Sequence, residues 1–223
     1  MGVKVSIILP IFNVERYIRQ CLESCVNQTF RDIEIICVDD CGGDYSMDIV
    51  REFAHLDKRI KIVKNPKNLG LFAARLAGAK VALGEYLFFL DSDDLLKLDA
   101  LEKISDFFGK DRVSVGINRL IEDRQEAFFS WEDKEFLTKE AFIKYQLGSK
   151  YPKWNLVGNL VKKEIYLKAF SYLKGDLKIT MAEDALTSFV LANLCETTIY
   201  KKEPLYLYRV NLDSISNVNK ERE

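Results

Sequence analysis

The chain has 223 residues, 48% of them hydrophobic and 30% charged, which suffices for one large domain or two small ones with a substantial core. Its net charge of -1 gives no electrostatic sign of nucleic-acid binding, and no apolar run reaches the roughly 20 residues that span a bilayer. The five cysteines form no CxxC pair, so we expect free thiols in a reducing compartment. Because His55 is the only histidine, we expect carboxylates to supply the acids and bases.

Strand-like and helix-like patterns alternate in the first half of the chain. β-branched and apolar runs predict strands over 3–10, 33–38, 60–63 and 86–90. Amphipathic or Ala-rich patterns predict helices over 17–25, 47–56, 69–83 and 97–108, the first of them capped by Asn13. This alternation predicts parallel βαβ units, and so an α/β fold with a mixed, mostly parallel sheet and helices on both faces.

Acidic residues follow two of these strands. Asp39 and Asp40 end the second strand, and the Asp-Ser-Asp-Asp sequence over 91–94 follows the fourth. Ligands of open α/β sheets bind beyond the carboxyl ends of the strands, so we expect the two clusters to share one crevice. The alternative for the first cluster is an Asx turn at the end of its strand.

The acidic cluster over 91–94 would be costly without a partner, because like charges raise each other's pKa. A divalent cation would remove that cost. Carboxylates with no cysteine or histidine beside them favour Mg²⁺ or Mn²⁺, ions that also bind substrate phosphates. The alternative is a solvated turn that caps a helix beginning near Leu95, since Asp and Ser are good N-caps, and Asp94 is the better candidate for that cap.

Beyond about residue 110 the pattern is less regular. The sequence predicts a strand over 113–117, strands or loops over 119–131, short strands over 197–200 and 205–208, and helices over 138–147 and 183–194. Thr138 would cap the first of these helices, 154–161 is ambiguous, and the polar tail from Asn217 is expected to fray. No linker marks a boundary, so we predict one domain over 1–223, with a nucleotide-binding half to about residue 110 and a more irregular half that completes the site.

Short motifs along nearly the whole chain occur in the order found in one enzyme family. They are 5–13 (VSIILPIFN), 28–30 (QTF), 38–40 (VDD), 68–70 (NLG) with Arg75, 84–86 (GEY), 91–94 (DSDD), 182–184 (AED), 205–209 (LYLYR) and 214–216 (SIS). Together they resemble family 2 glycosyltransferases of the Rossmann-like GT-A fold. The chain departs from the family at Phe12, where Tyr is commoner, and at Leu76, where many members have Asn and where the change would alter contacts with the donor sugar.

The resemblance implies an inverting, metal-dependent enzyme that moves a hexose or N-acetylhexosamine from a nucleotide diphosphate sugar, usually UDP-linked, to a glycan. The chain looks most like bacterial enzymes that add galactose or N-acetylhexosamine to lipooligosaccharide or capsule. This likeness implies a glycan or lipid-linked glycan acceptor, and a cytoplasmic enzyme associated with the inner face of the membrane. Relatives often continue with a basic segment that docks to the membrane, which we expect beyond Glu223 in a longer protein.

The resemblance also implies roles for residues on the donor side. Asp93 would bind Mn²⁺ or Mg²⁺, and Asp91 would reach the ribose, or the metal through water. Asp39 would accept a hydrogen bond from uracil N3–H, and Arg75 would pair with Asp39 or the diphosphate, unless it lies on the surface. The nucleotide-sugar contacts are expected from Pro10, Ile11, Asn13, Glu15, Asp39, Arg75, Asp91, Ser92 and Asp93.

On the acceptor side, the resemblance makes Asp184 the base that takes the proton of the acceptor hydroxyl. Only one of two adjacent helical side chains is expected to face the crevice, which leaves Glu183 as a weaker acceptor contact. The structural alternative is that both carboxylates simply suit the first turn of a helix. Tyr151 and Trp154 would stack on an acceptor sugar unless they belong to the core, and Arg209 would touch the diphosphate.

Other functions fit the residues less well. A nucleotidyltransferase would carry a Gly-rich loop with a basic residue after the first strand, where this chain has Asn13 and Glu15. A dehydrogenase would carry GxGxxG at that point. A non-catalytic nucleotide-sugar-binding domain stays an alternative, although both Asp93 and Asp184 are present.

Overall fold

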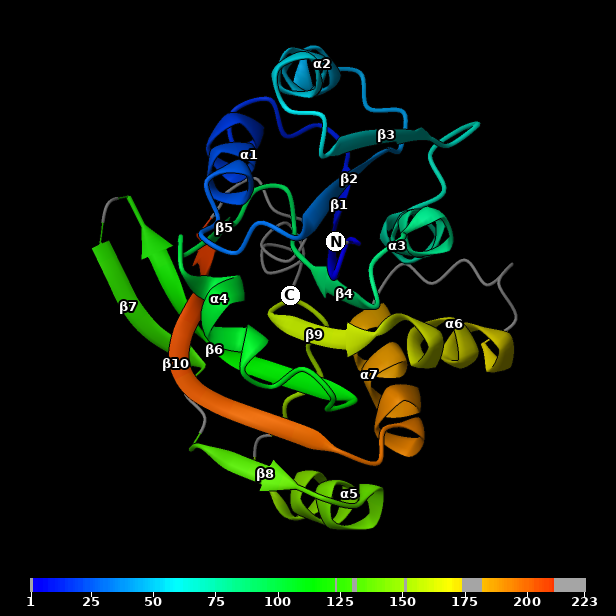
Figure 1. Ribbon diagram of the computed structural model, residues 1–223, viewed down its shortest axis with the longest axis vertical. Helices are drawn as coiled ribbons and strands as arrows, with labels where there is room; N and C mark the ends of the chain where they lie inside the picture. Colours follow the sequence, from blue (N-terminus) through cyan, green and yellow to red (C-terminus); the bar gives the residue numbers. More distant parts are fainter. Residues whose placement is uncertain (1, 123, 130–131, 151, 174–181, 211–223) are drawn as a thin grey trace, which may run out of the picture.

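The computed structural model describes residues 2–122, 124–129, 132–150, 152–173 and 182–210. Its helices are α1 (Ile18–Val26), α2 (Ser46–Leu56), α3 (Leu71–Val81), α4 (Ala100–Ser105), α5 (Lys139–Gly148), α6 (Lys163–Tyr172) and α7 (Glu183–Leu194). Its strands are β1 (Val5–Ile11), β2 (Ile33–Asp39), β3 (Ile60–Lys64), β4 (Tyr86–Phe89), β5 (Leu95–Leu96), β6 (Arg112–Ile121), β7 (Arg124–Phe129), β8 (Lys134–Phe136), β9 (Asn159–Lys162) and β10 (Thr198–Arg209). They form one sheet in the order β3-β2-β1-β4-β9-β6-β10-β5, with β7 beside β6 and β8 beside β10 (Figure 1).

The first four strands form a parallel unit that is covered on both faces. β1 pairs with β2 and β4, and β2 pairs with β3, all in parallel. Every residue of β1 and β2 is buried, because α1 and α2 cover one face and α3 covers the other (Figure 1). Ile7 and Ile35 pack on the α1 and α2 side, while their neighbours Ile8 and Ile36 pack on the α3 side. The polar residues that follow these strands therefore meet at one edge of the sheet.

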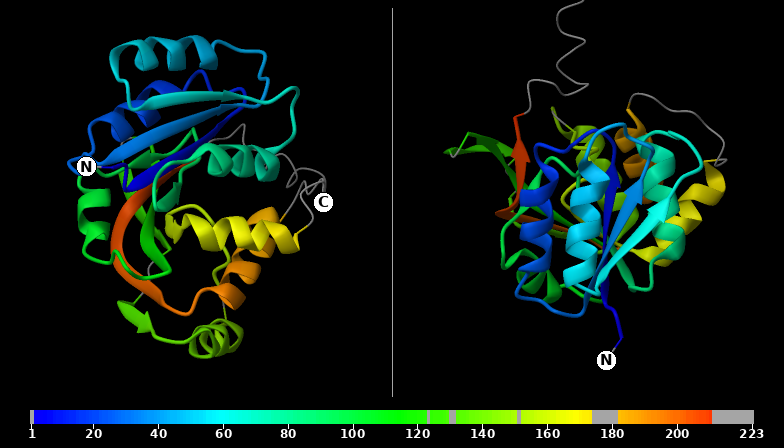
Figure 2. Two further views of the ribbon diagram at one scale, coloured as in Figure 1. Left: turned by 45° about the vertical axis from the view of Figure 1, so that its right-hand side comes forward. Right: turned by 90° about the horizontal axis from the view of Figure 1, so that it is seen from above.

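The second half of the chain extends the same sheet with mixed pairing. β9 is antiparallel to both β4 and β6. The long, curved β10 runs parallel to β6, and antiparallel to β8 near its start and to β5 near its end (Figure 2). The register between β10 and β6 shifts between Lys201 and Tyr206, where a Cβ on Gly116 would lie only 2.5 Å from the carbonyl oxygen of Lys202. Glycine at position 116 thus permits the bulge that brings the end of β10 beside the residues that follow β4.

The predicted fold class is confirmed as an α/β fold with a mixed, mostly parallel sheet and helices on both faces. Among the described strands, every antiparallel pair includes a strand of the second half. The predicted cap at Thr138 is confirmed, because its hydroxyl accepts a hydrogen bond from the backbone N–H of Ala141 at 3.2 Å. The division of the chain into two halves near residue 110 stays a prediction.

The helix expected near Leu95 is wrong. Leu95–Leu96 is the short strand β5, which pairs with Tyr206 and Leu207 of β10, and the helix that follows spans only Ala100–Ser105. An apolar pair followed by a helix-like pattern fits both structures locally, and only the pairing with β10 selects the strand.

Two further local predictions are wrong. Asn13 does not cap α1, which begins at Ile18; it has a φ of 55° and lies in the loop before the helix. The two short strands expected over 197–200 and 205–208 form the single strand β10. The expectations for 214–216 and for the tail from Asn217 lie outside the described residues.

Besides β5, two elements, β8 and α6, were not predicted by the sequence patterns. α6 packs beside α3, and Phe170 of α6 lies 4.6 Å from Phe72 of α3 between ring centroids. In the part of the chain that the structure describes, no helix has both the length and the apolar character needed to cross a membrane.

Candidate active site

A pocket of about 310 Å³ opens at the carboxyl ends of the parallel strands. It is lined by the end of β1, by residues that follow β1, β2, β3 and β4, and by the start of α3, namely Pro10, Ile11, Phe12, Val14, Asp40, Asn68, Gly70, Leu71, Ala74, Asp91, Ser92 and Asp93. The prediction that the two acidic clusters share one crevice is confirmed through Asp40, although Asp39 is not among the lining residues.

Asp39 and Asp40 organise the loops around this pocket. Asp39 Oδ1 accepts the backbone N–H two residues later at 2.9 Å, which is the Asx turn of the structural alternative. Asp40 accepts hydrogen bonds from the side-chain amide of Asn65 at 2.6 Å and from the backbone N–H groups of Leu69 and Gly70, both at 2.9 Å. Asp40 therefore fixes the loop before α3, and the contact of Asp39 with uracil stays a prediction.

Asn13 and Glu15 fasten the loop that follows β2. Asn13 Oδ1 accepts the backbone N–H of Gly43 at 2.8 Å, and Glu15 Oε2 accepts that of Tyr45 at 3.0 Å. The backbone N–H of Glu15 in turn donates to Asp44 at 2.8 Å. Neither Asn13 nor Glu15 lines the pocket, so the structure gives both a role in the loop, and their contact with a nucleotide stays a prediction.

The residues that follow β4 form a tight turn, here called the acidic turn (Asp91, Ser92, Asp93 and Asp94). The backbone N–H of Asp94 donates to the carbonyl of Asp91 at 3.0 Å, and Ser92 Oγ donates to the carbonyl of Pro10 at 2.7 Å. The Asp94 carboxylate accepts from the Tyr206 hydroxyl and from the backbone N–H of Arg209. The helix-cap alternative for the acidic turn is therefore wrong, because β5 follows the turn and Asp94 bonds to β10.

The three carboxyl groups of the acidic turn have different surroundings. Burial raises the pKa of Asp94 well above its usual range, and the neighbouring Asp93 and Asp91 raise it further, against the lowering effect of the bonds from Tyr206 and Arg209. Asp91 and Asp93 line the pocket, whereas Asp94 is only 1% exposed. The acidic turn thus offers the pocket two of its three carboxyl groups.

Arg75 on α3 joins carboxylates from both halves of the chain, and we call Arg75, Asp91, Glu183 and Asp184 the Arg75 cluster. Arg75 Nη2 donates to Asp91 Oδ1 at 2.8 Å, and Nη1 donates to Asp184 and lies 3.8 Å from Glu183 Oε1. The backbone N–H of Leu156 donates to the other oxygen of Asp184 at 3.2 Å. Arg75 is 1% exposed, so the surface alternative is wrong, and its partners are Asp91 and Asp184 rather than the predicted Asp39.

The Arg75 cluster holds more acidic groups than one guanidinium can balance. Burial raises the pKa of Asp91 despite the lowering effect of Arg75, and burial also raises the pKa of Glu183. For Arg75 itself burial lowers the pKa, but Asp184 and Asp91 outweigh burial and the net direction is upward. Glu183 and Asp184 both approach the same guanidinium nitrogen, and neither is among the residues that line the pocket, so the expectation that only one of them faces the crevice stays a prediction.

Arg209 lines a second pocket of about 430 Å³ and bonds to the acidic turn, which borders the first pocket. Its Nε donates to the carbonyl of Asp93 at 2.9 Å, and its Nη2 donates to Gln20 Oε1 at 2.5 Å. The contact of Arg209 with a diphosphate stays a prediction.

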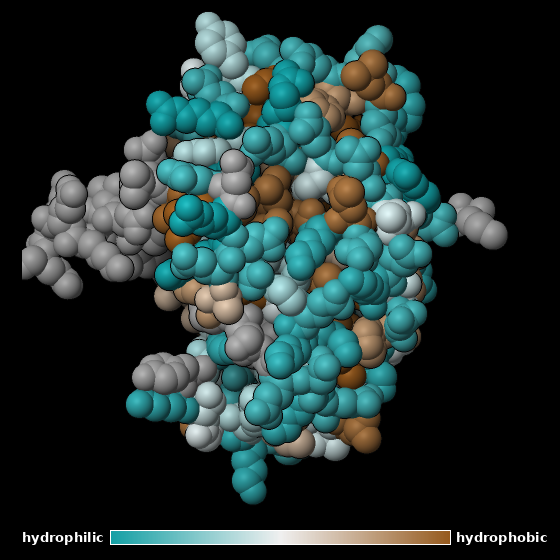
Figure 3. Space-filling model, turned by 90° about the vertical axis from the view of Figure 1, so that its left-hand side faces the viewer, coloured by the Kyte–Doolittle hydropathy of each residue, from teal (hydrophilic) through white to brown (hydrophobic). Residues whose placement is uncertain are grey.

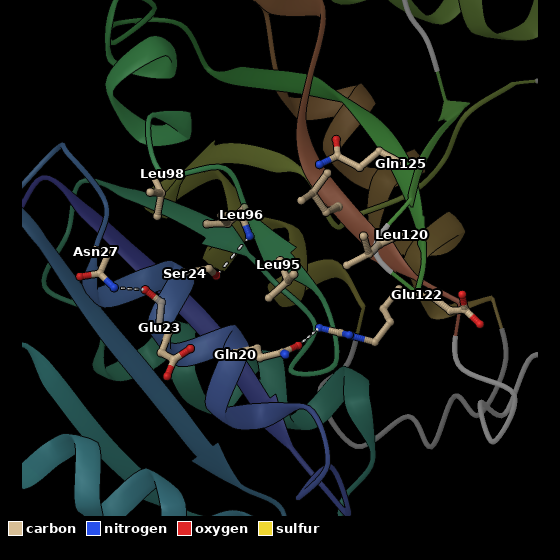
Figure 4. Close-up of a pocket in the computed structure, with 12 residues that line it drawn as sticks. Gln20, Glu23, Ser24, Asn27, Leu95, Leu96, Leu98, Leu120, Glu122 and Gln125 are labelled. Carbon is tan, nitrogen blue, oxygen red and sulfur yellow. Dashed lines mark hydrogen bonds between the residues drawn. The ribbon is translucent and has the colours of Figure 1, made fainter.

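The second pocket has a partly apolar lining. Leu95, Leu96 and other leucines lie there beside the polar residues of α1 (Figure 4). On the side of the molecule where β5 and β7 lie, Figure 3 shows hydrophobic residues surrounded by hydrophilic ones.

Of the two aromatic residues expected on the acceptor side, the structure describes only Trp154. Trp154 packs edge to face against Phe189 of α7, with 5.9 Å between ring centroids, and borders the small core of Phe136, Phe142 and Tyr200. This packing is what the core alternative predicts. Tyr151 lies outside the described residues, and stacking of Trp154 on an acceptor sugar stays a prediction.

The two departures from the family pattern lie in different surroundings. Phe12 lines the pocket and is 45% exposed, whereas Leu76 of α3 is 8% exposed and belongs to the core. The core position of Leu76 offers no direct support for the predicted effect on donor-sugar contacts, which stays a prediction.

A hard cation fits this pocket only with help from a ligand. Among the described residues, no three His, Cys, Asp or Glu side chains lie close enough to hold a metal ion together. Mg²⁺ and Mn²⁺ are, however, often bound by one or two carboxylates plus substrate phosphates. Asp93 lines the pocket, and Asp91 lines it while bonding to Arg75 through Oδ1. The donor set therefore fits a cation that arrives with a nucleotide diphosphate.

The roles of two residues of this site were missed by the sequence analysis. Asp40 was expected in the crevice, but its bonds to the loop before α3 were not predicted, and Tyr206 was noted only as part of a closing motif. The signal for Tyr206 is its place among apolar residues near the end of the last strand, but its partner could not be identified without the register of β10.

Comparison with known proteins gives one family and one fold. The model of the family described as Glycosyl transferase family 2 matches residues 6–184. EpsH of Bacillus subtilis (strain 168) is 36% identical over 95% of this chain, and the glycosyltransferase GlyA of Streptococcus pneumoniae serotype 4 is 31% identical over 96% of it. The chain spans only 62% of EpsH and 32% of GlyA.

Among solved structures, TarS of S. aureus, residues 1–349 in complex with UDP, has the same fold. It superposes on 94% of this chain and 61% of its own with a TM-score of 0.75 and 22% sequence identity. A further crystal structure of TarS contains UDP-GlcNAc.

Proposed function

Because the chain belongs to glycosyl transferase family 2, we propose that it moves a hexose or N-acetylhexosamine from a UDP-linked sugar to a glycan, with inversion at the anomeric carbon. The observation that carries this proposal is the Arg75 cluster, in which one buried arginine joins Asp91 of the acidic turn to Asp184 of α7. A donor-side group and a candidate base thus lie on either side of the same guanidinium. The UDP and UDP-GlcNAc complexes of TarS support a UDP-linked donor.

In the proposed reaction, Asp184 takes the proton of the acceptor hydroxyl as its oxygen attacks the anomeric carbon. The bond between that carbon and the UDP oxygen breaks on the opposite face of the sugar, and UDP leaves. Arg75 and the backbone N–H of Leu156 each bond one oxygen of Asp184 and so fix its orientation. A general base held in this way typically contributes about 10²–10⁴-fold to the rate.

The donor would lie in the pocket between the ends of β1 and β4. Pro10 and Ile11 border one side of it and the acidic turn the other, and Ser92 ties the two together through its bond to Pro10. Asp93, and Asp91 directly or through water, would hold Mn²⁺ or Mg²⁺, which would neutralise charge on the departing diphosphate. The remaining ligands of the cation would be phosphate oxygens.

Calorimetry of UDP binding tests the donor and the cation together. We expect UDP to bind the full chain in the presence of Mn²⁺ and to bind much more weakly in EDTA. The variant D93A should lose this metal dependence and keep its fold, since removing one carboxylate relieves repulsion within the acidic turn. Equal affinity for UDP with and without EDTA would contradict the proposed cation, and no binding of UDP in either condition would contradict the proposed donor.

A transfer assay separates catalysis from binding. With a UDP-sugar and a bacterial surface glycan, the wild-type chain should release UDP in amounts that match the sugar transferred. Donor binding without transfer or hydrolysis would support a non-catalytic nucleotide-sugar-binding domain instead.

We also propose that the acceptor is a lipid-linked glycan at the inner face of the cytoplasmic membrane. The resemblance to enzymes of lipooligosaccharide and capsule synthesis supports this acceptor. Fractionation of cells that express the full-length protein is the test, and recovery in the periplasm would refute the location.

A further inference from the structure

The end of β10 lies against the acidic turn although Asp91 and Tyr206 are 115 residues apart in the sequence. Tyr206 is 0% exposed and its hydroxyl makes two hydrogen bonds to the turn. The hydroxyl donates to the carboxylate of Asp94 and accepts the backbone N–H of Asp91 at 3.2 Å. A single oxygen thus spans the first and last residues of the turn.

The other contacts of the acidic turn hold its middle. Ser92 bonds to the carbonyl of Pro10 at 2.7 Å, and Arg209 Nε bonds to the carbonyl of Asp93 at 2.9 Å. The backbone N–H of Arg209 bonds to Asp94 at 2.7 Å. Between them, β1 and β10 hold every residue of the turn, and Arg75 of α3 holds the Asp91 carboxylate, so the backbone from which Asp91 and Asp93 project depends on strand β10.

We propose that Tyr206 is a positioning residue of the donor site, whose hydroxyl fixes the acidic turn so that Asp91 and Asp93 face the nucleotide pocket. This inference rests on the proposed function, because it assigns the turn to the donor. The burial of both Tyr206 and Asp94 supports this positioning role, because water cannot reach the turn there to replace the hydrogen bonds of a lost hydroxyl. Without that hydroxyl, the Asp94 carboxylate and the N–H of Asp91 each lose a partner.

The test compares two tyrosine-to-phenylalanine variants of the full chain. Y206F removes the hydroxyl that binds the acidic turn. Y86F removes an equally buried hydroxyl that also makes two hydrogen bonds, accepting from the N–H of Gly109 at 2.6 Å and donating to the carbonyl of Lys110 at 3.2 Å. Tyr86 begins β4, at the end of the strand away from the turn, so Y86F controls for the general cost of losing a buried hydroxyl.

We expect Y206F to bind UDP in the presence of Mn²⁺ about 10–100-fold more weakly than wild type, the range usual for groups that orient metal-binding side chains. Y86F should bind UDP as wild type does, even if both variants unfold at a similarly lowered temperature. Equal UDP affinity in Y206F and wild type would overturn the proposal. So would an equal loss in both variants, because stability alone would then explain the effect.

A second readout does not depend on the proposed function. Hydrogen exchange of the Asp91 backbone amide should be faster in Y206F than in wild type, and unchanged in Y86F. Unchanged exchange at Asp91 in Y206F would overturn the positioning role, whether or not the chain binds UDP. Failure of wild type to bind UDP, with faster exchange in Y206F, would instead contradict the proposed donor and leave the fastening of the turn by Tyr206 supported.

A double-mutant cycle identifies the partner of the hydroxyl. If Tyr206 acts through Asp94, the losses of UDP affinity in Y206F and D94N should not add in the double variant. Additive losses would contradict a path through Asp94.

Discussion

Arg75 and Arg112 are buried to the same degree, each 1% exposed, but they have opposite surroundings. Arg75 bonds to two carboxylates and approaches a third. Arg112, at the start of β6, donates to Asn159 Oδ1 at 2.8 Å and to the carbonyl of Asn155 at 3.3 Å, and approaches Ser188 Oγ at 3.5 Å. We call these four residues the Arg112 cluster. Within the described part of the chain, no carboxylate lies within ion-pair distance of Arg112.

This difference in partners distinguishes Arg112, which has a structural role, from Arg75, which belongs to the candidate active site. Neutral acceptors suffice to hold Arg112, and with it the segment before β9, against α7. A purely structural role for Arg75 would not explain the additional carboxyl groups around it, because burying extra charged groups costs free energy. Groups whose pKa is raised by burial, as for Asp91 and Glu183, are typical of sites that bind cations or move protons.

Helix α7 connects the two clusters. Asp184 in its first turn contacts Arg75, and Ser188 one turn later approaches Arg112. The backbone of residues 155–156 also connects the two clusters, because the carbonyl of Asn155 accepts from Arg112 and the N–H of Leu156 donates to Asp184. One substitution in each cluster, at Asp184 and at Ser188, can therefore be compared on the same helix.

The largest effect is expected from D184N, which keeps the shape of the side chain and removes its basicity. It should lower kcat for transfer by about 10²–10⁴-fold, with UDP affinity unchanged because the base contacts the acceptor. S188A, four residues along the same helix in the Arg112 cluster, is the control and should keep kcat. Kinetics of transfer and UDP calorimetry measure both quantities.

The companion variant E183Q decides between the two carboxylates of α7. It should lower kcat less than D184N does. Near-wild-type transfer by D184N together with loss of transfer in E183Q would make Glu183 the base, and activity in both variants would place the base elsewhere.

A smaller effect, on stability, is expected from R75M. This variant leaves three carboxyl groups facing each other without a cation, and breaking a buried ion pair from one side costs about 3–5 kcal/mol. Because those carboxyl groups keep 17–29% exposure, we expect about 3 kcal/mol, measured by urea denaturation. A loss no larger than that of the matched variant R112M would remove the distinction between the clusters.

R112M should cost less, because it leaves neutral groups rather than carboxylates without a partner. We expect a loss of about 1–3 kcal/mol in the free energy of unfolding, which at this chain length lowers Tm by about 2–4 °C per kcal/mol. Differential scanning calorimetry gives Tm, and UDP affinity should stay at the wild-type value. Weaker UDP binding by R112M would show that the Arg112 cluster also supports the donor pocket.

The smallest effect is expected in the pH dependence of E183Q. Burial raises the pKa of Glu183 in the folded state above its ordinary value of 4.5, so the folded chain binds more protons than the unfolded chain between the two pKa values. The contribution of Glu183 to stability is therefore present below 4.5 and falls as pH rises toward the folded pKa. E183Q has no such loss and should gain stability relative to wild type as pH rises.

Urea denaturation between about pH 4 and pH 8 measures this difference. E140Q is the matched control, because Glu140 lies in the first turn of α5 and is exposed, so it shares the helix N-terminus without the burial. A difference between E183Q and wild type that does not change with pH would contradict the effect of burial on Glu183.

The sequence by itself determined the features that depend on local patterns. Strands buried on both faces read as continuous apolar runs, so β1, β2 and β4 were predicted, and the acidic residues that follow them were expected at one edge of the sheet. Helix α7 has the predicted bounds, because acidic residues suit its first turn. The ordered motifs indicated the family that the family model confirms.

Only the tertiary structure decided which side chains meet. Arg75 and Asp184 are 109 residues apart, and Asp91 and Tyr206 are 115 apart. Their contacts depend on how α6 packs against both α3 and α7 and on the register of β10, neither of which is contained in a local pattern. For the same reason, Leu95–Leu96 reads as the start of a helix and becomes a strand only because β10 pairs with it. An arginine in an Ala-rich helix is compatible with several partners in the sequence, and the packing of the sheet and helices selects among them.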